Sequence, residues 1–292
     1  MATRLQIAKP DIVRHFDELP RKILRFGDIA AILTEQRAFW RLAQNTSTAD
    51  FIDFLTRNGK LKHLEFPFPS RKEQRYVWGD VPLLEVLLTL KKGAYFCHYT
   101  AVRMHGLTEQ VPKTIYLNHE QRPRPPGTAL SQASIDRAFR NRPRVSQNLI
   151  DYDDARICLI NGKSTNQLGV VTEEVTYDDV RPIRVRLTNI ERTLIDITVR
   201  PMYAGGIHEV LKAFQLAQER LSVNRLVATL QQLGHVYPYH QAIGFYLERA
   251  GYKDSLLDLL RRFPKEFDFY LSYQMGPTEY VKEWRLHIPK GF

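Results

Sequence analysis

Cysteine is almost absent from this chain, and its scarcity excludes whole classes of protein. Only Cys97 and Cys158 occur among 292 residues, each within an apolar stretch and neither in a Cys-x-x-Cys pair. Two such cysteines cannot build a disulfide framework, so we expect a reducing compartment and no structural metal. The chain also lacks the apolar core of a signal peptide and any run of about 18 apolar residues, the length of a membrane span. These absences predict a cytoplasmic protein with no membrane partner.

Signatures of the common enzyme classes are missing as well. The sequence holds no P-loop, Gly-x-Gly-x-x-Gly, Gly-x-Ser-x-Gly or His-Glu-x-x-His motif. A nuclease of the carboxylate–lysine type needs Glu-x-Lys, and no Glu here is followed two residues later by Lys. The spacing of Arg57 and His63 is similar to an RNase motif, but it straddles a predicted helix end. We therefore expect no catalytic site, no cofactor and no enzymatic activity.

The nine histidines do not form an evident metal site. His235 and His240 are the nearest pair with a ligand-like spacing, but Pro238 lies between them and no acidic or Cys ligand is beside them. The pattern therefore indicates two histidines that pack in the fold.

Basic residues are abundant, and they are concentrated in the first half of the chain. The formal net charge is +10, which favours partners that carry phosphates or anionic membrane surfaces. Residues 1–80 hold 14 Lys and Arg against 10 Asp and Glu, and residues 81–160 hold 11 against 7. Residues 161–292 hold 17 against 15. With hydrophobic residues at 43%, the length suits two domains with real cores.

Three helices are predicted within the first eighty residues. The first opens at Pro10-Asp11, and the second begins near Gly27-Asp28, where Asp28 can cap it. The third follows a Thr/Ser cluster that supplies the N-cap, and Asn58-Gly59 ends it. Its apolar side chains would share one buried face: Phe51, Ile52, Phe54 and Leu55.

A strand over residues 60–66, a basic loop over 68–74 and a returning strand over 75–78 are predicted after the third helix. Three helices followed by such a hairpin are the element order of a winged helix-turn-helix domain, which we place at residues 1–80. Its helix face would fit the major groove while the hairpin reaches phosphates. The side chains predicted to meet bases or nearby phosphates are Ser47, Thr48, Asp50 and Arg57. Those predicted to hold the DNA backbone are Lys60, Lys62, Arg71, Lys72 and Arg75. The alternative is a small helical domain whose solvated hairpin binds another protein.

Residues 81–292 are predicted to form a larger mixed α/β domain with a helix-rich C-terminal half, so the fold class is α+β. An Arg- and Pro-rich insert over residues 119–148 interrupts this domain. Between residues 122 and 144 it carries six Arg and one Asp. The insert is either a second phosphate-contacting surface or docking arm, or a solvated loop. Its arginines are Arg122, Arg124, Arg137, Arg140, Arg142 and Arg144.

Three segments of the second half resemble the AbiEi family of antitoxins. They are residues 98–108 running into 112–116, the stretch 188–196 that contains Glu-Arg-Thr-Leu-Ile-Asp, and Pro201 followed by Gly205-Gly206-Ile207. The resemblance implies a two-domain protein encoded beside a nucleotidyltransferase-like toxin, in a system that resists bacteriophage by abortive infection. It implies that the N-terminal domain binds inverted repeats in the operon's own promoter and that the C-terminal domain is needed to neutralise the toxin. The insert at 119–148 departs from a minimal member of the family.

The same residues also have a purely structural interpretation. Arg192 and Asp196 are four apart on a helix and can pair, while Leu194 and Ile195 face the core. The pair Gly205-Gly206 allows the chain to turn tightly before the next helix. These residues are therefore expected to hold the fold.

The leading hypothesis is a DNA-binding antitoxin that represses transcription of its own toxin–antitoxin operon. Its partners would be double-stranded DNA, at inverted repeats of the promoter, and the cognate toxin, opposed directly or functionally. One alternative is a protein-interaction module that sequesters the toxin directly, with the winged helix as a dock. Another is a DNA-binding nuclease, which the missing metal-ligating set disfavours.

Overall fold

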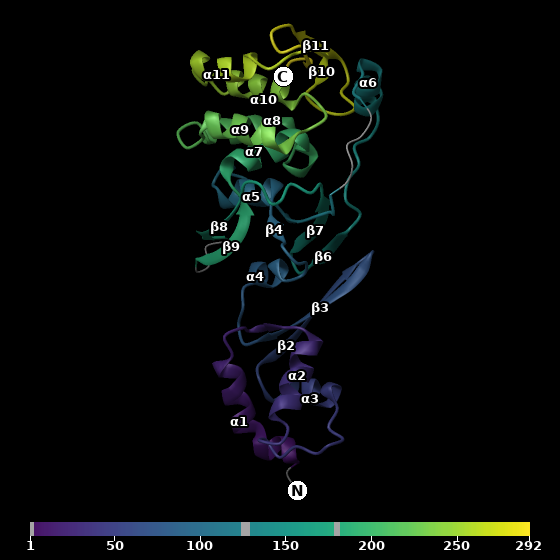
Figure 1. Ribbon diagram of the computed structural model, residues 1–292, viewed down its shortest axis with the longest axis vertical. Coiled ribbons are helices and arrows are strands. Elements are labelled where there is room, and N and C mark those ends of the chain that lie inside the picture. Colours follow the sequence, from purple (N-terminus) through teal and green to yellow (C-terminus); the bar gives the residue numbers. More distant parts are fainter. Residues whose placement is uncertain (1–2, 124–128, 178–181) are drawn as a thin grey trace. The chain divides into compact units, whose positions relative to one another are not determined.

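The computed structural model describes residues 3–123, 129–177 and 182–292 (Figure 1). The chain divides into two compact units, Met1–Lys92 (unit 1) and Gly93–Phe292 (unit 2). Both units combine helices with sheets, so the molecule is of mixed α and β structure, as the sequence indicates.

Unit 1 extends past the boundary expected at residues 80/81, and two polar contacts explain why. The guanidinium of Arg75 donates to the hydroxyl of Thr89 at 2.9 Å, and Lys91 pairs with Glu73 at 2.7 Å. These contacts tie the segment after residue 80 to the strand that precedes it. Helix α4 (Leu83–Leu88) therefore belongs with the N-terminal residues.

Three helices and a three-stranded antiparallel sheet precede α4 in unit 1. Their order is α1 (Arg4–Glu18), β1 (Ile23–Leu24), α2 (Phe26–Gln36), α3 (Thr48–Asn58), β2 (Leu61–Phe68) and β3 (Arg71–Trp78). The strand order is β1-β3-β2. The core joins all three helices to the sheet, with Ile12, Phe16, Ile29, Phe51 and Trp78 among its buried side chains.

The starts of the first two helices differ from the sequence prediction. Helix α1 begins before Pro10, at Arg4, because the hydroxyl of Thr3 caps it by accepting from the Gln6 N–H at 3.3 Å. Proline within a helix removes one backbone donor, and the burial of Ile12 and Phe16 outweighs that loss. In α2, the N-cap is Arg25 and Asp28 occupies the third helical position. The Asp28 carboxylate accepts from the Arg25 N–H at 2.7 Å.

The third helix is confirmed, and the hairpin after it is longer than expected. Ser47 caps α3, and Gly59 ends it. The predicted loop over 68–74 is wrong, because the antiparallel ladder continues to Phe68 opposite Arg71 and leaves only Pro69-Ser70 as the turn. Phe66 and Phe68 are both buried, so the strand's period of two holds its register up to the tip.

Unit 2 is built on a six-stranded sheet with the order β6-β7-β5-β4-β9-β8. The strands are β4 (Tyr95–Phe96), β5 (Thr114–Glu120), β6 (Leu149–Tyr152), β7 (Ala155–Gly162), β8 (Val170–Val175) and β9 (Ile183–Thr188). Two pairs are parallel, β5 with β7 and β4 with β9, and the other pairs are antiparallel. The parallel pairs bring the carboxyl ends of β5 and β7 to one edge of the sheet.

The helix-rich C-terminal half is confirmed, and it shares a core with a second small sheet. Helix α5 (His98–Met104) follows β4, and the later helices are α7 (Ile190–Val199), α8 (Ile207–Leu216), α9 (Val223–Leu233), α10 (Tyr239–Arg249) and α11 (Asp254–Arg261). Figure 1 shows α8 to α11 gathered together with the short sheet beside α10 and α11. That sheet has the order β10-β12-β11, from β10 (Phe269–Tyr270), β11 (Thr278–Val281) and β12 (Leu286–Pro289).

Part of the Arg- and Pro-rich insert is folded into this core. Helix α6 (Gln132–Arg140) buries Ile135 and Phe139, and the Phe139 ring stacks on Tyr273 at 4.4 Å. The Tyr270 hydroxyl donates to Asp136 at 3.0 Å. Residues 131–141 are typical of a short helix in sequence, and this is confirmed. The alternative of a solvated loop is therefore wrong for this part of the insert.

Both cysteines are free and buried, and burial raises the pKa of each thiol above its ordinary value.

Over the described residues, no helix combines the length and apolar character that crossing a bilayer requires.

The contact between Gly244 and Trp284 gives a direct test of packing in unit 2. A Cβ on Gly244 would overlap the Trp284 ring, which is fully buried and donates to Glu248 at 2.8 Å. We expect Gly244→Ala to lower the free energy of unfolding by about 1–3 kcal/mol, since the ring has no room to move. Urea denaturation followed by near-ultraviolet circular dichroism measures the change.

The matched control is Gly276→Ala, since a Cβ there would meet nothing within 4 Å. It should stay within about 0.5 kcal/mol of the parent chain. Equal stabilities for the two variants would contradict this account of the core.

Candidate functional site

The predicted base-contacting residues lie on and just before α3, and two of them are engaged with each other. Asp50 accepts from the Ser47 hydroxyl at 2.6 Å and from its N–H at 3.2 Å, while the Ser47 hydroxyl accepts from the Asp50 N–H at 3.1 Å. The hydrogen bond from the Ser47 hydroxyl lowers the pKa of Asp50. This capping box leaves half-buried Thr48 and exposed Arg57 as the predicted residues whose side chains are not part of the cap.

Arg57 is weakly held, because its partner Asp53, 2.9 Å away, is also exposed. Lys60 pairs with Asp17 at 2.9 Å, and this hydrogen bond is the largest cause of the lowered pKa of Asp17. Lys62 lies 3.4 Å from Asp80. Exposed pairs of this kind are weak in water and are readily exchanged for a phosphate.

The tip of the β2–β3 hairpin carries the least compensated charge of the predicted set. Arg71 and Lys72 are both exposed and follow the Pro69-Ser70 turn directly. Arg71 lies 3.8 Å from Glu73, and within the described part of the chain Lys72 forms no ion pair.

Arg75 does not belong to this surface, which corrects the sequence prediction. Its side chain is only 3% exposed, and its nitrogens donate to Thr89 and to the Gln74 carbonyl. Burial lowers the pKa of Arg75 from its ordinary value, and nearby Arg25 acts in the same direction. The residue anchors α4 to β3 and is unavailable to a partner.

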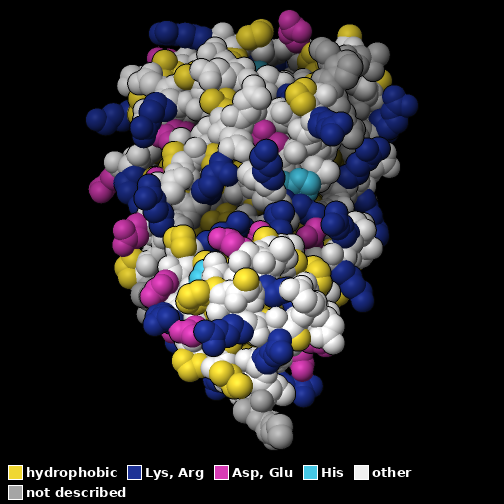
Figure 2. Space-filling model, turned by 60° about the horizontal axis from the view of Figure 1, so that its bottom comes forward, with side chains coloured by type: hydrophobic (Ala, Val, Ile, Leu, Met, Phe, Trp, Pro, Cys, Tyr) yellow, Lys and Arg dark blue, Asp and Glu magenta, His cyan; other side chains and the backbone are white. Residues whose placement is uncertain are grey.

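Figure 2 shows how charge is distributed over one face of the molecule. Lys and Arg side chains there lie among acidic, hydrophobic and uncharged ones and do not merge into one continuous patch. Contacts with a polyanion on this face would therefore come from separate cationic side chains.

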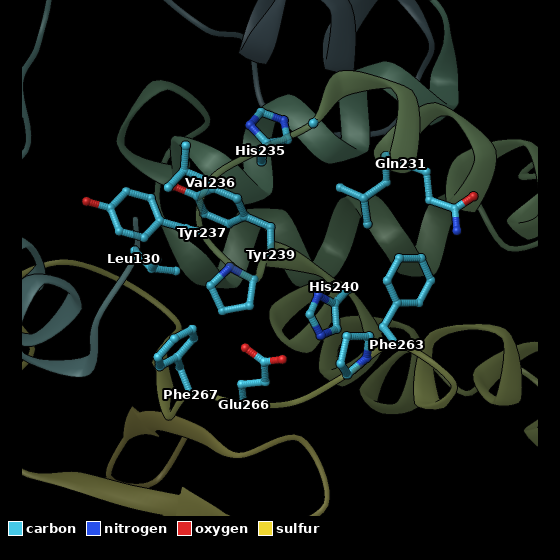
Figure 3. Close-up of a pocket in the computed structure, with 14 residues that line it drawn as sticks. Leu130, Gln231, His235, Val236, Tyr237, Tyr239, His240, Phe263, Glu266 and Phe267 are labelled. Atoms are coloured by element: carbon cyan, nitrogen blue, oxygen red, sulfur yellow. The ribbon is translucent and has the colours of Figure 1, made fainter. Parts of the chain in front are cut away.

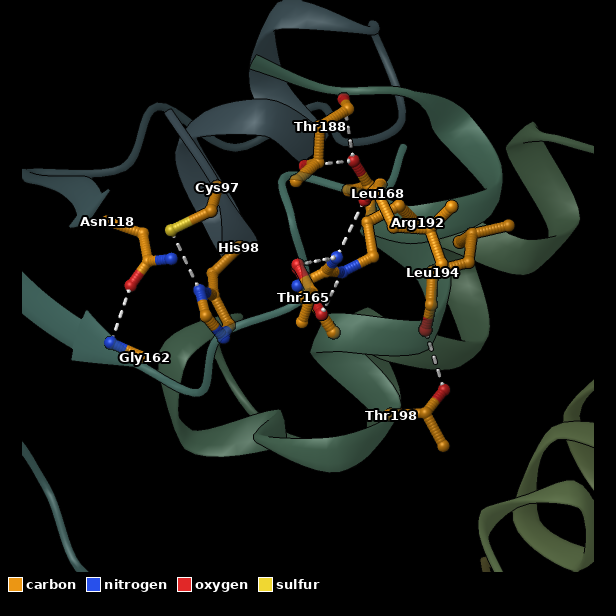
Figure 4. A network of polar contacts seen from close by, with 12 residues as sticks. Cys97, His98, Asn118, Gly162, Thr165, Leu168, Thr188, Arg192, Leu194 and Thr198 are labelled. Atoms are coloured by element: carbon orange, nitrogen blue, oxygen red, sulfur yellow. Dashed lines mark hydrogen bonds and ion pairs between the residues drawn. The ribbon is translucent and has the colours of Figure 1, made fainter. Parts of the chain in front are cut away.

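Unit 2 contains a buried ion pair between Arg192 and Asp196. Figure 4 shows Arg192 with Thr165 and Leu168, its other hydrogen-bond partners. Arg192 donates from Nε to Asp196 at 2.7 Å, and from Nη1 to the Leu168 carbonyl at 2.7 Å and the Thr165 hydroxyl at 3.2 Å. The two side chains are 7% and 12% exposed. Burial disfavours the charged guanidinium, but Asp196 outweighs this and the pKa of Arg192 is raised. The pairing expected from the spacing of four residues is confirmed.

The segment 98–108 contacts the segment 188–196, which holds this pair. His105 lies with Nε2 2.7 Å from the Thr188 carbonyl oxygen, and the hydroxyls of Thr188 and Thr193 lie 2.7 Å apart. Gly205 and Gly206 have φ values of +79° and +100°, which favour glycine and make the expected tight turn. Chain segments far apart in sequence therefore share one polar network.

His98 has a strained backbone beside this network. Its φ is +49°, unusual for a residue other than glycine, and its Nδ1 lies 3.0 Å from the Cys97 sulfur. Its ring meets Tyr203 edge-on at 5.2 Å. Burial lowers the pKa of His98 to about 4, so the imidazole is neutral at neutral pH.

A cavity of about 1080 Å³ opens beside the network, and its lining is strongly basic; we call it the cationic cavity. The end of β5, the segment after β7, α7 and the loop between α9 and α10 all contribute to it. Its charged lining residues are Arg122, Arg144, Lys163, Arg192, Asp196 and Arg200.

The sequence interpretation missed this cavity. It placed the insert's arginines on one separate surface, whereas Arg122 and Arg144 line the cavity. Arg137, Arg140 and Arg142 are exposed on or just after α6. Arg124 lies outside the described residues. Arg192 and Asp196 are the residues of the lining that the sequence had singled out. Their spacing predicts that they pair with each other, but it does not predict a cavity beside them.

His235 and His240 line a smaller cavity of about 390 Å³, with Tyr237, Tyr239 and Phe267 around it (Figure 3). His240 stacks on Phe263 at 5.1 Å, and His235 meets Tyr239 edge-on at 5.4 Å. Within the described ranges, no three His, Cys, Asp or Glu side chains are grouped as a metal site would need. The two rings pack in the fold, as their sequence context indicates.

Comparison with known proteins identifies a fold but no family. No family model and no curated protein matches the chain. Among solved structures, it is similar to the Rv2827c protein from Mycobacterium tuberculosis, with 14% sequence identity and a TM-score of 0.61. The likeness covers 98% of this chain and 93% of that one, so both units have counterparts in the same overall fold.

Buried neutral histidines predict an acid-sensitive unit 2. Burial lowers the pKa of His98, His235 and His240 to about 4, against about 6.5 in the unfolded chain. The unfolded chain therefore binds protons first as the pH falls, so stability is full above about pH 6.5 and is lost from there towards pH 4. We expect the free energy of unfolding to fall by about 2 kcal/mol per buried histidine from about pH 7 to about pH 5.

Two variants test this expectation by urea denaturation at both pH values. His240→Gln removes one buried imidazole and should flatten the pH dependence by about one histidine's share. His208→Gln, at an exposed position, should leave the dependence unchanged. An equal pH dependence in the parent chain and His240→Gln would contradict the assignment.

Proposed function

We propose that unit 1 is a winged helix-turn-helix that binds duplex DNA, with α3 as the groove-facing helix and β2–β3 as the wing. The supporting observation is the order α1-β1-α2-α3-β2-β3 with a sheet of order β1-β3-β2. A helix with one buried face is followed at once by a hairpin whose tip carries Arg71 and Lys72. Such a unit puts a helix in the major groove while the wing contacts phosphates.

Most of the affinity comes from the wing and its neighbouring lysines. Helix α3 carries the carboxylates of Asp50 and Asp53 on its exposed side, and these repel phosphates. Arg57 is released when its exposed pair with Asp53 opens, and it then reaches a base edge or a phosphate. Lys60 and Lys62 exchange their exposed carboxylate partners for phosphates in the same way.

The biological role is that of an antitoxin that represses its own operon. The resemblance of unit 2 segments to the AbiEi family supports this role, with promoter inverted repeats as the DNA partner and a nucleotidyltransferase-like toxin as the opponent. Relief of promoter repression by wing variants tests autoregulation. Co-purification of the two proteins at high salt tests direct sequestration, because ionic contacts through DNA are lost there.

Removing the wing's charges should weaken DNA binding and flatten its salt dependence. Arg71→Ala combined with Lys72→Ala removes two phosphate contacts, each worth a slope of about 0.9 in a plot of log K against log salt. We expect the slope to fall by about 2 and the affinity for all duplex sequences to fall together. Fluorescence anisotropy at several salt concentrations measures both quantities.

The control removes the same charge elsewhere, with Lys282→Ala and Lys290→Ala, two exposed residues of unit 2. It should leave the slope within experimental error of the parent chain. Unchanged binding and an unchanged slope in the Arg71/Lys72 variant would show that the hairpin is not the wing.

A further inference from the structure

The cationic cavity of unit 2 has far more positive than negative charge in its lining. Five cationic side chains face one carboxylate, Asp196, and that carboxylate is bonded to Arg192. Lys163 donates to the carbonyl oxygens of Leu233 and Gly234, at 3.1 and 3.0 Å, which orient its ammonium without neutralising it. Positive charges gathered in a concave site produce a strong positive electrostatic potential, which attracts an anion.

Three further arginines carry no compensating charge. Arg122, Arg144 and Arg200 form no ion pair within the described part of the chain, and Arg200 is half-buried where α7 ends. The charge of Arg200 acts on other residues of the lining, because it is among the causes that lower the pKa of His98 and His235. An anion in the cavity would therefore meet free guanidinium groups, which bind phosphate oxygens with two parallel hydrogen bonds.

The cavity lies where the parallel strands β5 and β7 end, the edge at which open α/β sheets bind ligands. Its lining includes Asn118 and Gln121 from the end of β5, and Ile160 to Gly162 from the end of β7. Gly162 donates its N–H to the Asn118 side chain at 3.0 Å, and a Cβ there would lie 2.7 Å from that oxygen. The close approach of these two strand ends shapes the floor of the cavity.

Tyrosines form another part of the lining. Tyr203, Tyr237, Tyr239 and Tyr273 contribute to it, together with the apolar side chain of Val236. The volume of about 1080 Å³ is slightly above the range of about 300–1,000 Å³ that small-molecule sites occupy, and it far exceeds the volume of one phosphate. A ligand that matches both kinds of lining side chain carries phosphates together with a flat ring.

We infer that the cationic cavity binds a nucleotide, with its phosphates on Arg144, Lys163 and Arg200 and its base against the tyrosines of the lining. Arg192 is a positioning residue, because Asp196, Thr165 and Leu168 hold it in place beside the site. The side-chain amide oxygen of Gln121 and the neutral imidazole of His98 offer hydrogen bonds to uncharged ligand groups. The site is independent of the DNA surface proposed for unit 1.

Calorimetric titration of the full chain at low salt tests this inference. The probes are ATP, GTP, inorganic triphosphate and a short single-stranded oligonucleotide. We expect at least one nucleoside triphosphate to bind with a Kd below about 1 mM and about tenfold more tightly than inorganic triphosphate. Absence of binding, equal affinity for inorganic triphosphate, or binding of the oligonucleotide alone would each overturn the assignment.

Variants locate the binding in the cavity. Arg200→Gln combined with Arg144→Gln should weaken the nucleotide by at least about tenfold, while Lys282→Gln with Lys290→Gln, which removes the same charge, should change it less than about twofold. Arg144→Gln alone, at an exposed residue, should weaken binding about threefold and serves if the double variant does not fold. Equal losses in cavity and control variants would overturn the inference.

Failure of this site can be told apart from failure of the DNA proposal. The chain with Arg71→Ala and Lys72→Ala should keep its full nucleotide affinity, because both residues belong to unit 1. Loss of nucleotide binding in that variant would place the nucleotide on the hairpin and overturn the cavity assignment.

Discussion

The buried pair of Arg192 and Asp196 is the constraint on which unit 2 depends. A guanidinium removed from water needs a partner for its charge and for its donors, and Asp196, Leu168 and Thr165 supply them. Meeting that need fixes α7 against the segment that joins β7 to β8. Gly169 is part of the same arrangement, because a Cβ there would lie 2.7 Å from the Arg192 Cβ. The six-stranded sheet and the helical half are thereby held together beside the cationic cavity.

The two proposed sites use cations in opposite ways. In unit 1 the charges of Arg57, Lys60 and Lys62 are exposed and paired with exposed carboxylates, so they suit a large polyanion whose binding depends on salt. In unit 2 the charges of Lys163 and Arg200 line one concave site. Such a site suits a small anion of defined shape.

Sequence patterns were reliable where one local feature decides the structure. The hydroxyl of Ser47 and the Asn58-Gly59 pair marked both ends of α3, because caps act within one turn. The pattern was less reliable for α1, where packing of Ile12 and Phe16 carries the helix through Pro10. The predicted hairpin was too short, because the run of charged residues at its tip is typical of a loop. In the structure, burial of Phe66 and Phe68 keeps these residues in the strands of the sheet.

The sequence by itself determined the alternation of helices and strands, the surplus of basic charge and the pairing of Arg192 with Asp196, since each follows from local periodicity or from composition. Only the tertiary structure decided which cations are available to a partner. In sequence Arg75 resembles the other wing residues, but in the structure it is buried and donates to Thr89. Arg144 and Arg200 are far apart in sequence, yet both line the cationic cavity. The physical reason is that a side chain's burial and neighbours depend on contacts between distant segments, which no local pattern encodes.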